Sequence, residues 1–550
     1  MLRRPSRLAL AFALVASGCY DGAALDALLA AGDEGEEGST TGAGSSSTGA
    51  EASGGDEEGT SEGSTSAGEV GAAPAIAAFT VDGSSAPAPI DSARAVSVAV
   101  AVADAAAVSR VEIHDGEALV AALVSPPFSM EWLVDDVVAS SPRALRAVAF
   151  GPGGEASAPA LVPVSFSLPD GGTPRWMAEA EAEAGDGAVV AMAIAADGDV
   201  VTMGERRVDA VTSQMVLVRR DPGDGAIRWE RRFPSTPIAG ERRVGRALAI
   251  AEDGALVVGG ALVSAGEGAR LYAALHEGDG ALREGYVGAM GESLRDVAAV
   301  PGGDVVVVGS VGASEVLAEE SGWDEGGEVL VRRYRAGWST RWSTSAVEGL
   351  DEIWSSGQAV EVTSDGSVVV AGTYGADDAS PRAFVARFGH DGAPLWAQVD
   401  LPPGLASDRA AGLTLNRRGE AVVVATARVA GDPYSRVEIR RLRALDGALL
   451  SVDALVGGVG DEVAGGVVVD RHDRLHVVAT RVDGEGRRDV GISKLSSDGG
   501  AVLWARTHDG GPGGEALGAA VAVDSLGYVY VGGTEAGASG SRAWSGAFHP

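Results

Sequence analysis

Residues 357–400 read GQAVEVTSDGSVVVAGTYGADDASPRAFVARFGHDGAPLWAQVD, with turn residues between short apolar runs. An apolar run leads into a tight turn at Gly366, a Val-rich run follows, and Gly372 comes six residues after the turn. Short apolar runs bounded by turn residues are typical of strands that are covered on both sides. The stretch therefore predicts a unit of four strands, over residues 357–366, 367–374, 382–388 and 393–401.

The same unit recurs seven times, at intervals of 56, 49, 63, 53, 54 and 54 residues. Its turns lie at Gly198, Gly254, Gly303, Gly366, Gly419, Asp473 and Gly527. The small residues six positions later are Gly204, Gly260, Gly309, Gly372, Ala425, Ala479 and Gly533. A small residue at a fixed place in a strand indicates that another backbone passes too close for a larger side chain. Units of this length and strand content predict the blades of a β-propeller, because one blade cannot bury its own faces.

The two ends of the repeat array predict how a ring closes. The seventh unit stops at Pro550 after three strands, whereas a spare fourth-strand segment with Trp176 precedes the first unit. Tryptophan also marks the fourth strand of other units, at Trp229, Trp342, Trp396 and Trp504. An unpaired edge invites aggregation, so we expect residues 173–181 to complete the last blade. The prediction is an all-β chain with a seven-bladed β-propeller over residues 173–550.

Three of the repeats resemble a known family. The segments DVGISKLSSDG at 489–499, AVAVDSLGYVYVGGT at 520–534 and RAFVARFGHDG at 382–392 look like the bacterial β-propeller repeat called SBBP. The run through Asp221, Gly225 and Trp229 is similar to the tryptophan-docking motif of pyrroloquinoline quinone (PQQ) dehydrogenases. Those enzymes usually have eight blades and often a vicinal cysteine pair, whereas this chain has seven units and one cysteine. The resemblance therefore implies the fold, and we expect no cofactor.

That single cysteine follows a short apolar run at the N-terminus. Three arginines, at positions 3, 4 and 7, precede the apolar residues 8–15, and the sequence ASGC at 16–19 resembles the lipobox cleaved by lipoprotein signal peptidase. The resemblance implies that residues 1–18 are removed as a signal peptide and that Cys19 is lipidated. The run is too short to span a membrane, so attachment would come from the lipid. Because Tyr20 and not Asp follows Cys19, we expect the outer membrane of a cell envelope.

Two further segments separate this anchor from the repeats. Residues 20–72 hold 12 acidic residues and no Lys or Arg among Gly, Ser and Thr, so the segment 19–72 is predicted to be a disordered acidic tether. Alternating strands over 96–104, 109–124, 128–134 and 145–157 are similar to bacterial immunoglobulin-like (Ig-like) domains, with Trp132 as a core residue. We expect this Ig-like β-sandwich over residues 73–168 to act as a spacer.

Charge narrows the partners. The net charge is −34, and loss of the three leader arginines lowers it to −37. Such a field disfavours nucleic acid, so the expected partners are the membrane, through the lipid, and an unidentified protein, peptide or glycan.

Motifs of catalysis do not occur in the sequence. There is no G-x-S-x-G elbow in a strand-to-helix context, no H-E-x-x-H, no P-loop and no paired C-x-x-C. His472 and His476 lie four residues apart around a turn, which we attribute to a solvated turn and not to a metal site. We therefore expect no catalytic residues, no metal and no enzyme activity.

Loop lengths suggest where binding takes place. Two kinds of connection are long and irregular: those between the second and third strands of a unit, and those between one unit and the next. In a propeller both kinds of connection lie on the same face. Candidate binding residues on this loop face are Trp323, Asp324, Asp351, Trp354, Tyr374, Asp377, Asp378 and Tyr434. Exposed aromatics beside carboxylates suit carbohydrate, peptide or cation binding; the alternative is solvated loops with incidental aromatics.

Two function classes stay open. The first is a non-catalytic cell-envelope lipoprotein, possessing no cofactor, that presents a β-propeller as a binding or scaffold module. The alternative is an envelope enzyme, either a quinoprotein-like dehydrogenase or a hydrolase that uses carboxylates at the channel mouth. The sequence does not identify the ligand.

Overall fold

A computed structural model of the chain describes residues 73–140, 142–179, 187–264, 268–312, 327–345, 347, 349–350, 354–375, 380–399, 402, 404–455, 460–483, 485–510, 514–537 and 540–550. Strands dominate this part, with two single-turn 3-10 helices, η1 (Ala105–Ala107) and η2 (Val138–Ser140). Within the described ranges no helix has the length and apolar character that crossing a membrane requires. The signal peptide, Cys19 and the acidic tether lie outside the described residues.

The N-terminal module consists of two sheets packed face to face. One sheet has the order β1-β2-β5 and the other the order β4-β3-β6-β7. Their strands are β1 (Ile76–Val81), β2 (Arg94–Val102), β3 (Arg110–Asp115), β4 (Ala118–Leu123), β5 (Phe128–Val134), β6 (Arg143–Phe150) and β7 (Ala160–Val164). Alternate residues of both sheets form one apolar core, in which Trp132 is buried and meets Phe166 edge to face. The prediction of Trp132 as a core residue is confirmed.

Among the described residues, the rest of the strands form seven four-stranded sheets. The first three contain β9 (Gly187–Ile194), β10 (Val200–Arg207), β11 (Ser213–Arg220), β12 (Ile227–Phe233); β13 (Glu241–Ile250), β14 (Leu256–Ser264), β15 (Gly268–His276), β16 (Leu282–Met290); and β17 (Glu292–Val300), β18 (Asp304–Val311), β19 (Glu328–Tyr334), β20 (Thr340–Thr344). The next three contain β21 (Trp354–Val362), β22 (Val368–Gly375), β23 (Arg382–Phe388), β24 (Pro394–Val399); β25 (Leu405–Leu415), β26 (Glu420–Val429), β27 (Arg436–Arg443), β28 (Leu449–Ala454); and β29 (Glu462–Val469), β30 (Leu475–Val482), β31 (Arg488–Leu495), β32 (Val502–His508). The last contains β33 (Glu515–Val523), β34 (Val529–Gly537), β35 (Gly540–Phe548) and, from before the first sheet, β8 (Pro174–Glu179).

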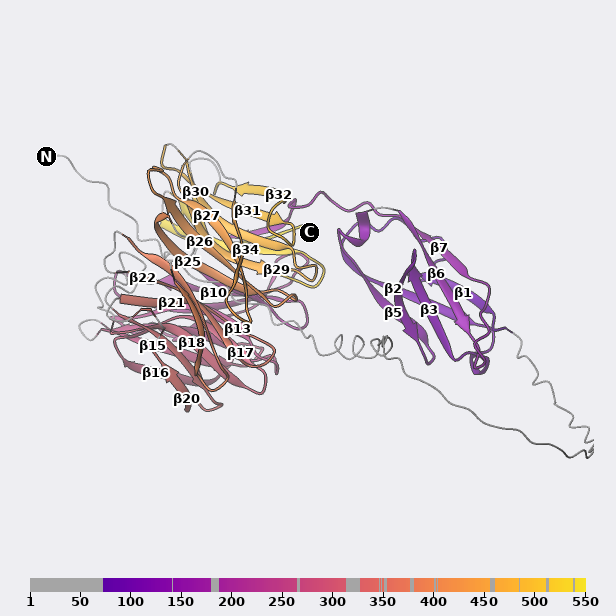
Figure 1. The fold of residues 1–550 in the computed structure, drawn as a ribbon, viewed down its shortest axis with the longest axis horizontal. Coiled ribbons are helices and arrows are strands. Elements are labelled where there is room, and N and C mark those ends of the chain that lie inside the picture. Colours follow the sequence, from indigo (N-terminus) through magenta and orange to yellow (C-terminus); the bar gives the residue numbers. More distant parts are fainter. Residues whose placement is uncertain are drawn as a thin grey trace, which may run out of the picture.

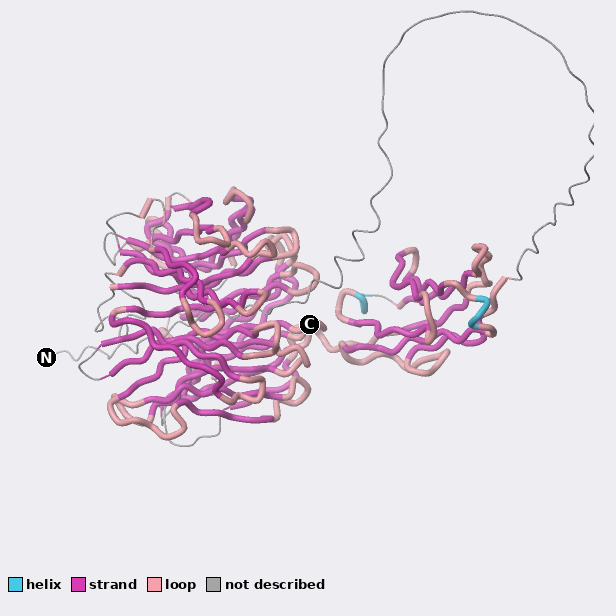
Figure 2. Tube along the Cα trace, turned by 90° about the horizontal axis from the view of Figure 1, so that it is seen from below, coloured by secondary structure: helices cyan, strands magenta, loops and turns pink. Residues whose placement is uncertain are grey.

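The sheets follow one another around a common axis (Figures 1 and 2). The first strand of each sheet contacts the first strand of the next, from β9 through β33, and β33 contacts β9 again. Apolar clusters fill the spaces between neighbouring sheets, for example between the sheets that begin with β17 and β21. Because each sheet buries its faces on two neighbours, the chain has the arrangement of a β-propeller.

A β-bulge explains the small residue that recurs in the second strand of each sheet. Each first strand carries one extra residue at this level, and the residues directly before it face the small ones. A Cβ atom added to Gly309 would lie 2.1 Å from the backbone oxygen of Ser293, and one added to Gly260 would lie 2.0 Å from that of Val244. The prediction of a close backbone approach is confirmed, and its cause is the bulge.

Tryptophans of the fourth strands connect several of the sheets to the next one. The Trp342 indole packs on Gly392, whose φ is +85°, and its Nε1 donates to the backbone oxygen of His390 at 3.0 Å. Trp396 repeats this contact one sheet later, donating to the backbone oxygen of Ala444 at 3.1 Å. A side chain on the glycine would occupy the place of the ring, so the turn and the tryptophan are matched.

The last sheet is completed by a strand from the other end of the array. β8 pairs with β35 in antiparallel register, with Trp176 opposite Ala547. Trp176 is buried, and its Nε1 donates to the backbone oxygen of Pro222 at 3.0 Å in the first sheet. The two ends of the array therefore meet in one sheet.

Ion pairs join the N-terminal module to the propeller. Asp135 accepts hydrogen bonds from Arg471 at 2.6 Å and lies 2.6 Å from Nε2 of His472. Asp136 accepts two parallel bonds from Arg474, at 2.8 and 2.9 Å, and one from Lys494 at 2.8 Å. We call these six residues the docking cluster. The arginines and His472 belong to the turn between the first and second strands of the sixth sheet, so the module lies on the turn side of the propeller.

The expectation that His472 lies in a solvated turn is wrong. Its ring is held against Asp135. His476 is fully buried beside Asp470, and burial lowers the pKa of its imidazole, although the hydrogen bond to Asp470 opposes this effect. The two histidines therefore serve packing and docking, each with its own carboxylate.

Candidate functional site

Only part of the predicted loop face lies in the described chain. Five of the eight candidate residues fall outside the described residues, namely Trp323, Asp324, Asp351, Asp377 and Asp378. Of the other three, Trp354 and Tyr374 lie on neighbouring strands of the fourth sheet, at the start of β21 and near the end of β22, whereas Tyr434 lies between β26 and β27 of the fifth sheet. The structure does not bring these three side chains together.

The three described aromatics differ in exposure. Tyr434 is 46% exposed, and its backbone N–H donates to Asp432 in a tight turn. Trp354 is half-buried. Tyr374 packs into the core between two sheets, with its ring centroid 6.5 Å from that of Phe384. The interpretation of Tyr374 as an exposed recognition residue is wrong, because β22 is buried along its whole length, Tyr374 included.

Buried ion pairs lie near this face and hold the sheets together. Asp408 of the fifth sheet accepts a bond from Arg382 of the fourth sheet at 2.8 Å and pairs with Arg440 of its own. Glu438 lies beside them and pairs with Arg436 and Arg440. Both carboxylates are buried and already have cationic partners, so their geometry is that of structural pairs.

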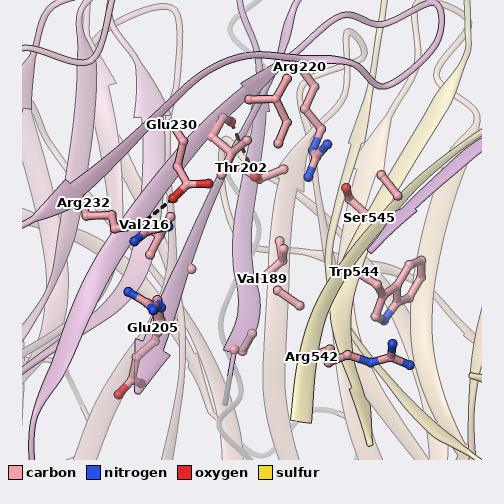
Figure 3. Close-up of a pocket in the computed structure, with 18 residues that line it drawn as sticks. Val189, Thr202, Glu205, Val216, Arg220, Glu230, Arg232, Arg542, Trp544 and Ser545 are labelled. Atoms are coloured by element: carbon pink, nitrogen blue, oxygen red, sulfur yellow. Dashed lines mark hydrogen bonds and ion pairs between the residues drawn. The ribbon is translucent and has the colours of Figure 1, made fainter. Parts of the chain in front are cut away.

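A second candidate site lies in the seam between the first and last sheets (Figure 3). It is a cavity of about 160 Å³ between β9 to β12 on one side and β8 with β35 on the other. Small and branched apolar residues form part of the wall: Ala178, Ala188, Val189, Val216, Val218, Ile227 and Ala543. The charged residues are four arginines, Arg206, Arg220, Arg232 and Arg542, and two glutamates, Glu205 and Glu230. We call this space the seam pocket.

Arg220 is the most buried of these charges. It is the last residue of β11, is 6% exposed, and donates from one guanidinium nitrogen to the backbone oxygen of Gly225 at 2.9 Å. Its Nε has no hydrogen-bond partner, and among the described residues Arg220 forms no ion pair. Burial lowers the pKa of Arg220, and the charge of Glu230 opposes that shift. A buried cation with an unused donor is costly unless an anion joins it.

Both carboxylates of the seam pocket have an arginine partner. Glu230 accepts a bond from Arg232 at 2.6 Å, on the side of the pocket away from Arg220 (Figure 3). Glu205 pairs with Arg242 of the second sheet at 3.3 Å. The Trp544 indole points out of the pocket, into the core between the sixth and seventh sheets. The free interior is therefore a cationic end at Arg220 with an apolar wall.

Sequence reasoning did not find the seam pocket. Ser545 of β35 lies more than 300 residues after Arg220 in the chain, and the two meet only because the last sheet packs against the first. The available signal was Arg220 itself, a cation at the end of an otherwise alternating strand, SQMVLVRR. That signal alone does not distinguish a pocket residue from a solvated strand end.

No protein-family model matches this sequence, and no curated protein matches it either. Solved structures with a similar arrangement of sheets include quinohemoprotein alcohol dehydrogenase from Comamonas testosteroni, at 9% identity and a TM-score of 0.35 over 61% of this chain and 65% of that one. An α-L-arabinofuranosidase from Fusarium graminearum matches at 11% identity and a TM-score of 0.38, over 55% of this chain and 92% of that one. A polysaccharide lyase, an ulvan lyase, matches at 11% identity and a TM-score of 0.38, over 66% and 91%. These relatives are β-propellers, and the likeness concerns the fold alone.

Proposed function

We propose that this chain is a non-catalytic cell-envelope lipoprotein that presents a β-propeller as a binding or scaffold module. In this proposal the seven sheets are the blades of a seven-bladed propeller built from SBBP-type repeats over residues 173–550, with β8 completing the last blade. Residues 73–168 form an Ig-like spacer, residues 19–72 a disordered tether, and residues 1–18 a signal peptide. The protein is held in the membrane, in our proposal the outer membrane, by lipid on Cys19.

One observation supports this proposal above the others. The N-terminal module is docked on the turn side of the propeller through Asp135 and Asp136. The long connections of the loop face leave the sheets at the opposite ends of their strands. A chain tethered through its N-terminus would therefore hold the loop face away from the membrane, where a protein, peptide or glycan can reach it.

The anchor is tested by Cys19→Ala. We expect the variant to lose incorporation of labelled palmitate and to accumulate as an unprocessed or soluble protein, because the proposed attachment depends on one lipidated residue. Ser17→Ala, which keeps the cysteine, serves as the control. Label retained by Cys19→Ala would contradict the lipoprotein proposal.

The enzyme alternative has a direct test. Residues 73–550 are mixed with PQQ and calcium, and the absorbance of the bound quinone is measured after gel filtration. We expect no stoichiometric quinone spectrum. A stoichiometric spectrum would replace the binding proposal with a quinoprotein dehydrogenase.

A further inference from the structure

We infer that the seam pocket binds a small monocarboxylate with an apolar body of roughly six to eight non-hydrogen atoms. The pocket lies between the first and last sheets and not on the loops, so this inference goes beyond the proposed function. It rests on three features of the described residues: the cavity, the buried guanidinium of Arg220, and the apolar wall.

The charge of the pocket selects an anion. Four arginines and two glutamates line the pocket, and three of these arginines, Arg206, Arg232 and Arg542, have interaction partners of their own. Glu230 and Glu205 already pair with Arg232 and Arg242, whereas Arg220 has no ion pair within the described chain. In Figure 3 its guanidinium lies between the strands of the first sheet and Ser545 of the last. A ligand anion placed beside this guanidinium would offset a buried charge that has no ion pair among the described residues.

The shape of that donor set favours a carboxylate. A guanidinium presents its donors in a planar fork that matches the two oxygens of a carboxylate, and charge-assisted bonds of this kind are the strong ones. One nitrogen of Arg220 is fixed on Gly225, which holds the plane of the fork in place. The hydroxyl groups of Thr202 and Ser545 also line the pocket, and Thr202 makes only a long bond of 3.5 Å to the backbone oxygen of Val218.

The size and wall of the pocket select the rest of the ligand. A cavity of about 160 Å³ is close to that of an engineered protein cavity that admits benzene, at about 150 Å³. Val189, Val216 and Ile227 offer an apolar surface against which a ring or a branched chain can pack. Benzoate satisfies both requirements and is the probe of choice.

The test measures binding to the full chain purified in detergent, by calorimetry and by the shift in melting temperature. Benzoate is expected to bind and to raise the melting temperature, because a ligand that binds only the folded state stabilises it. Benzamide, which has the same shape without the charge, and inorganic phosphate, which lacks the apolar body, are expected to bind at least about tenfold more weakly. Equal binding of benzamide or phosphate, or no binding of benzoate, would overturn the inference.

Variants separate this site from a general effect of charge. Arg220→Gln should weaken benzoate binding by at least about tenfold, whereas Arg443→Gln, which removes an exposed arginine paired with Asp446, should leave it unchanged. Val216→Phe keeps every charge and fills the pocket, so it should also abolish binding. If Arg220→Gln does not fold, Val216→Phe still decides the question, and undiminished binding to either variant overturns the inference.

A last variant tests whether acidic residues of the chain itself affect benzoate binding. Glu181, Glu183 and Asp186 follow β8 in sequence and lie outside the described residues. The variant E181Q/E183Q/D186N should bind benzoate at least as tightly as the wild type, since an internal competitor or a repelling charge can only weaken binding. Loss of benzoate binding in this variant would mean that the pocket needs local acidic residues, and would contradict an anion site.

Discussion

At the scale of single residues, the propeller depends on how close two backbones approach. The small residue of each second strand lies opposite the bulge of the first strand, and five of these seven residues are glycine. The two alanines, Ala425 and Ala479, lie at bulges formed by Ala411 and Gly465. There the neighbouring backbone leaves room for a methyl group. The restriction is therefore steric and local, and it does not require an unusual φ at the glycine.

Gly309→Ala tests this restriction. Its Cβ would lie 2.1 Å from the backbone oxygen of Ser293, so the bulge has to shift, and we expect a loss of stability of about 1–3 kcal/mol. The measurement is chemical denaturation of both proteins. Ala425→Gly is the matched control and should cost only about 0.5–1 kcal/mol, through backbone entropy. If Gly309→Ala is as stable as the wild type, the close approach is not a constraint.

At the scale of elements, β8 gives the last sheet its fourth strand. β8 brings Trp176 onto the first sheet, with the same indole-to-turn contact that Trp342 and Trp396 make between other sheets. The ring of sheets is therefore joined by the same contact across its seam as elsewhere. Removing β8 exposes the edge of β35 and the apolar wall of the seam pocket together.

Two truncations test the role of β8. Deleting residues 1–182 should lower the melting temperature of the propeller well below that of a protein lacking only residues 1–168, because the first deletion leaves β35 as an open edge. Both truncations lose the N-terminal module and the docking cluster, so the difference belongs to β8. Equal melting temperatures would mean that β8 is a linker that does not stabilise the propeller.

Trp176→Ala isolates the side chain from the strand. The indole is buried, so we expect a loss of about 3–5 kcal/mol in the free energy of unfolding, measured by denaturant titration of the full chain. Met177→Ala, at the exposed neighbouring position, is the control and should change little. A loss below about 1 kcal/mol would show that the indole is dispensable for closure.

The sequence predicts a strand correctly where a short apolar run is bounded by turn residues. The predicted strands 382–388 and 128–134 agree with β23 and β5, because turn residues bound both runs. The run 109–124 is two strands, β3 and β4, since Gly116 adopts a φ of +61° and reverses the chain. The seam pocket and the docking cluster were not predictable, because each joins residues more than 300 positions apart. A local pattern carries no information about such pairs.

At the scale of the whole molecule, charge positions the two folded parts. Burial acts to raise the pKa of Asp135, but bonds from His472, the backbone and Arg471 outweigh it, so its pKa lies below the ordinary value. The pKa of Asp136 is lowered in the same way, against burial, by Arg474 and Lys494. Lys494 is the only lysine of the chain and is fully buried in this contact, and burial lowers its pKa. Docking therefore favours the ionised form of both carboxylates.

The pH dependence of docking follows from the sign of these shifts. A carboxylate whose pKa is lowered in the docked state stabilises that state above its ordinary pKa near 4, and this contribution is lost as the pH falls through the lower pKa. D135N/D136N imitates the protonated state at neutral pH. We expect this variant at pH 7 to show a larger radius of gyration in small-angle scattering than the wild type, because the N-terminal module is released from the turn side. Asp115→Asn, which breaks the pair with Arg143 inside the module, is the control and should leave the radius unchanged. An unchanged radius for D135N/D136N would mean that apolar contacts and the bond from Tyr528 to the backbone oxygen of Ala93 are sufficient to hold the module.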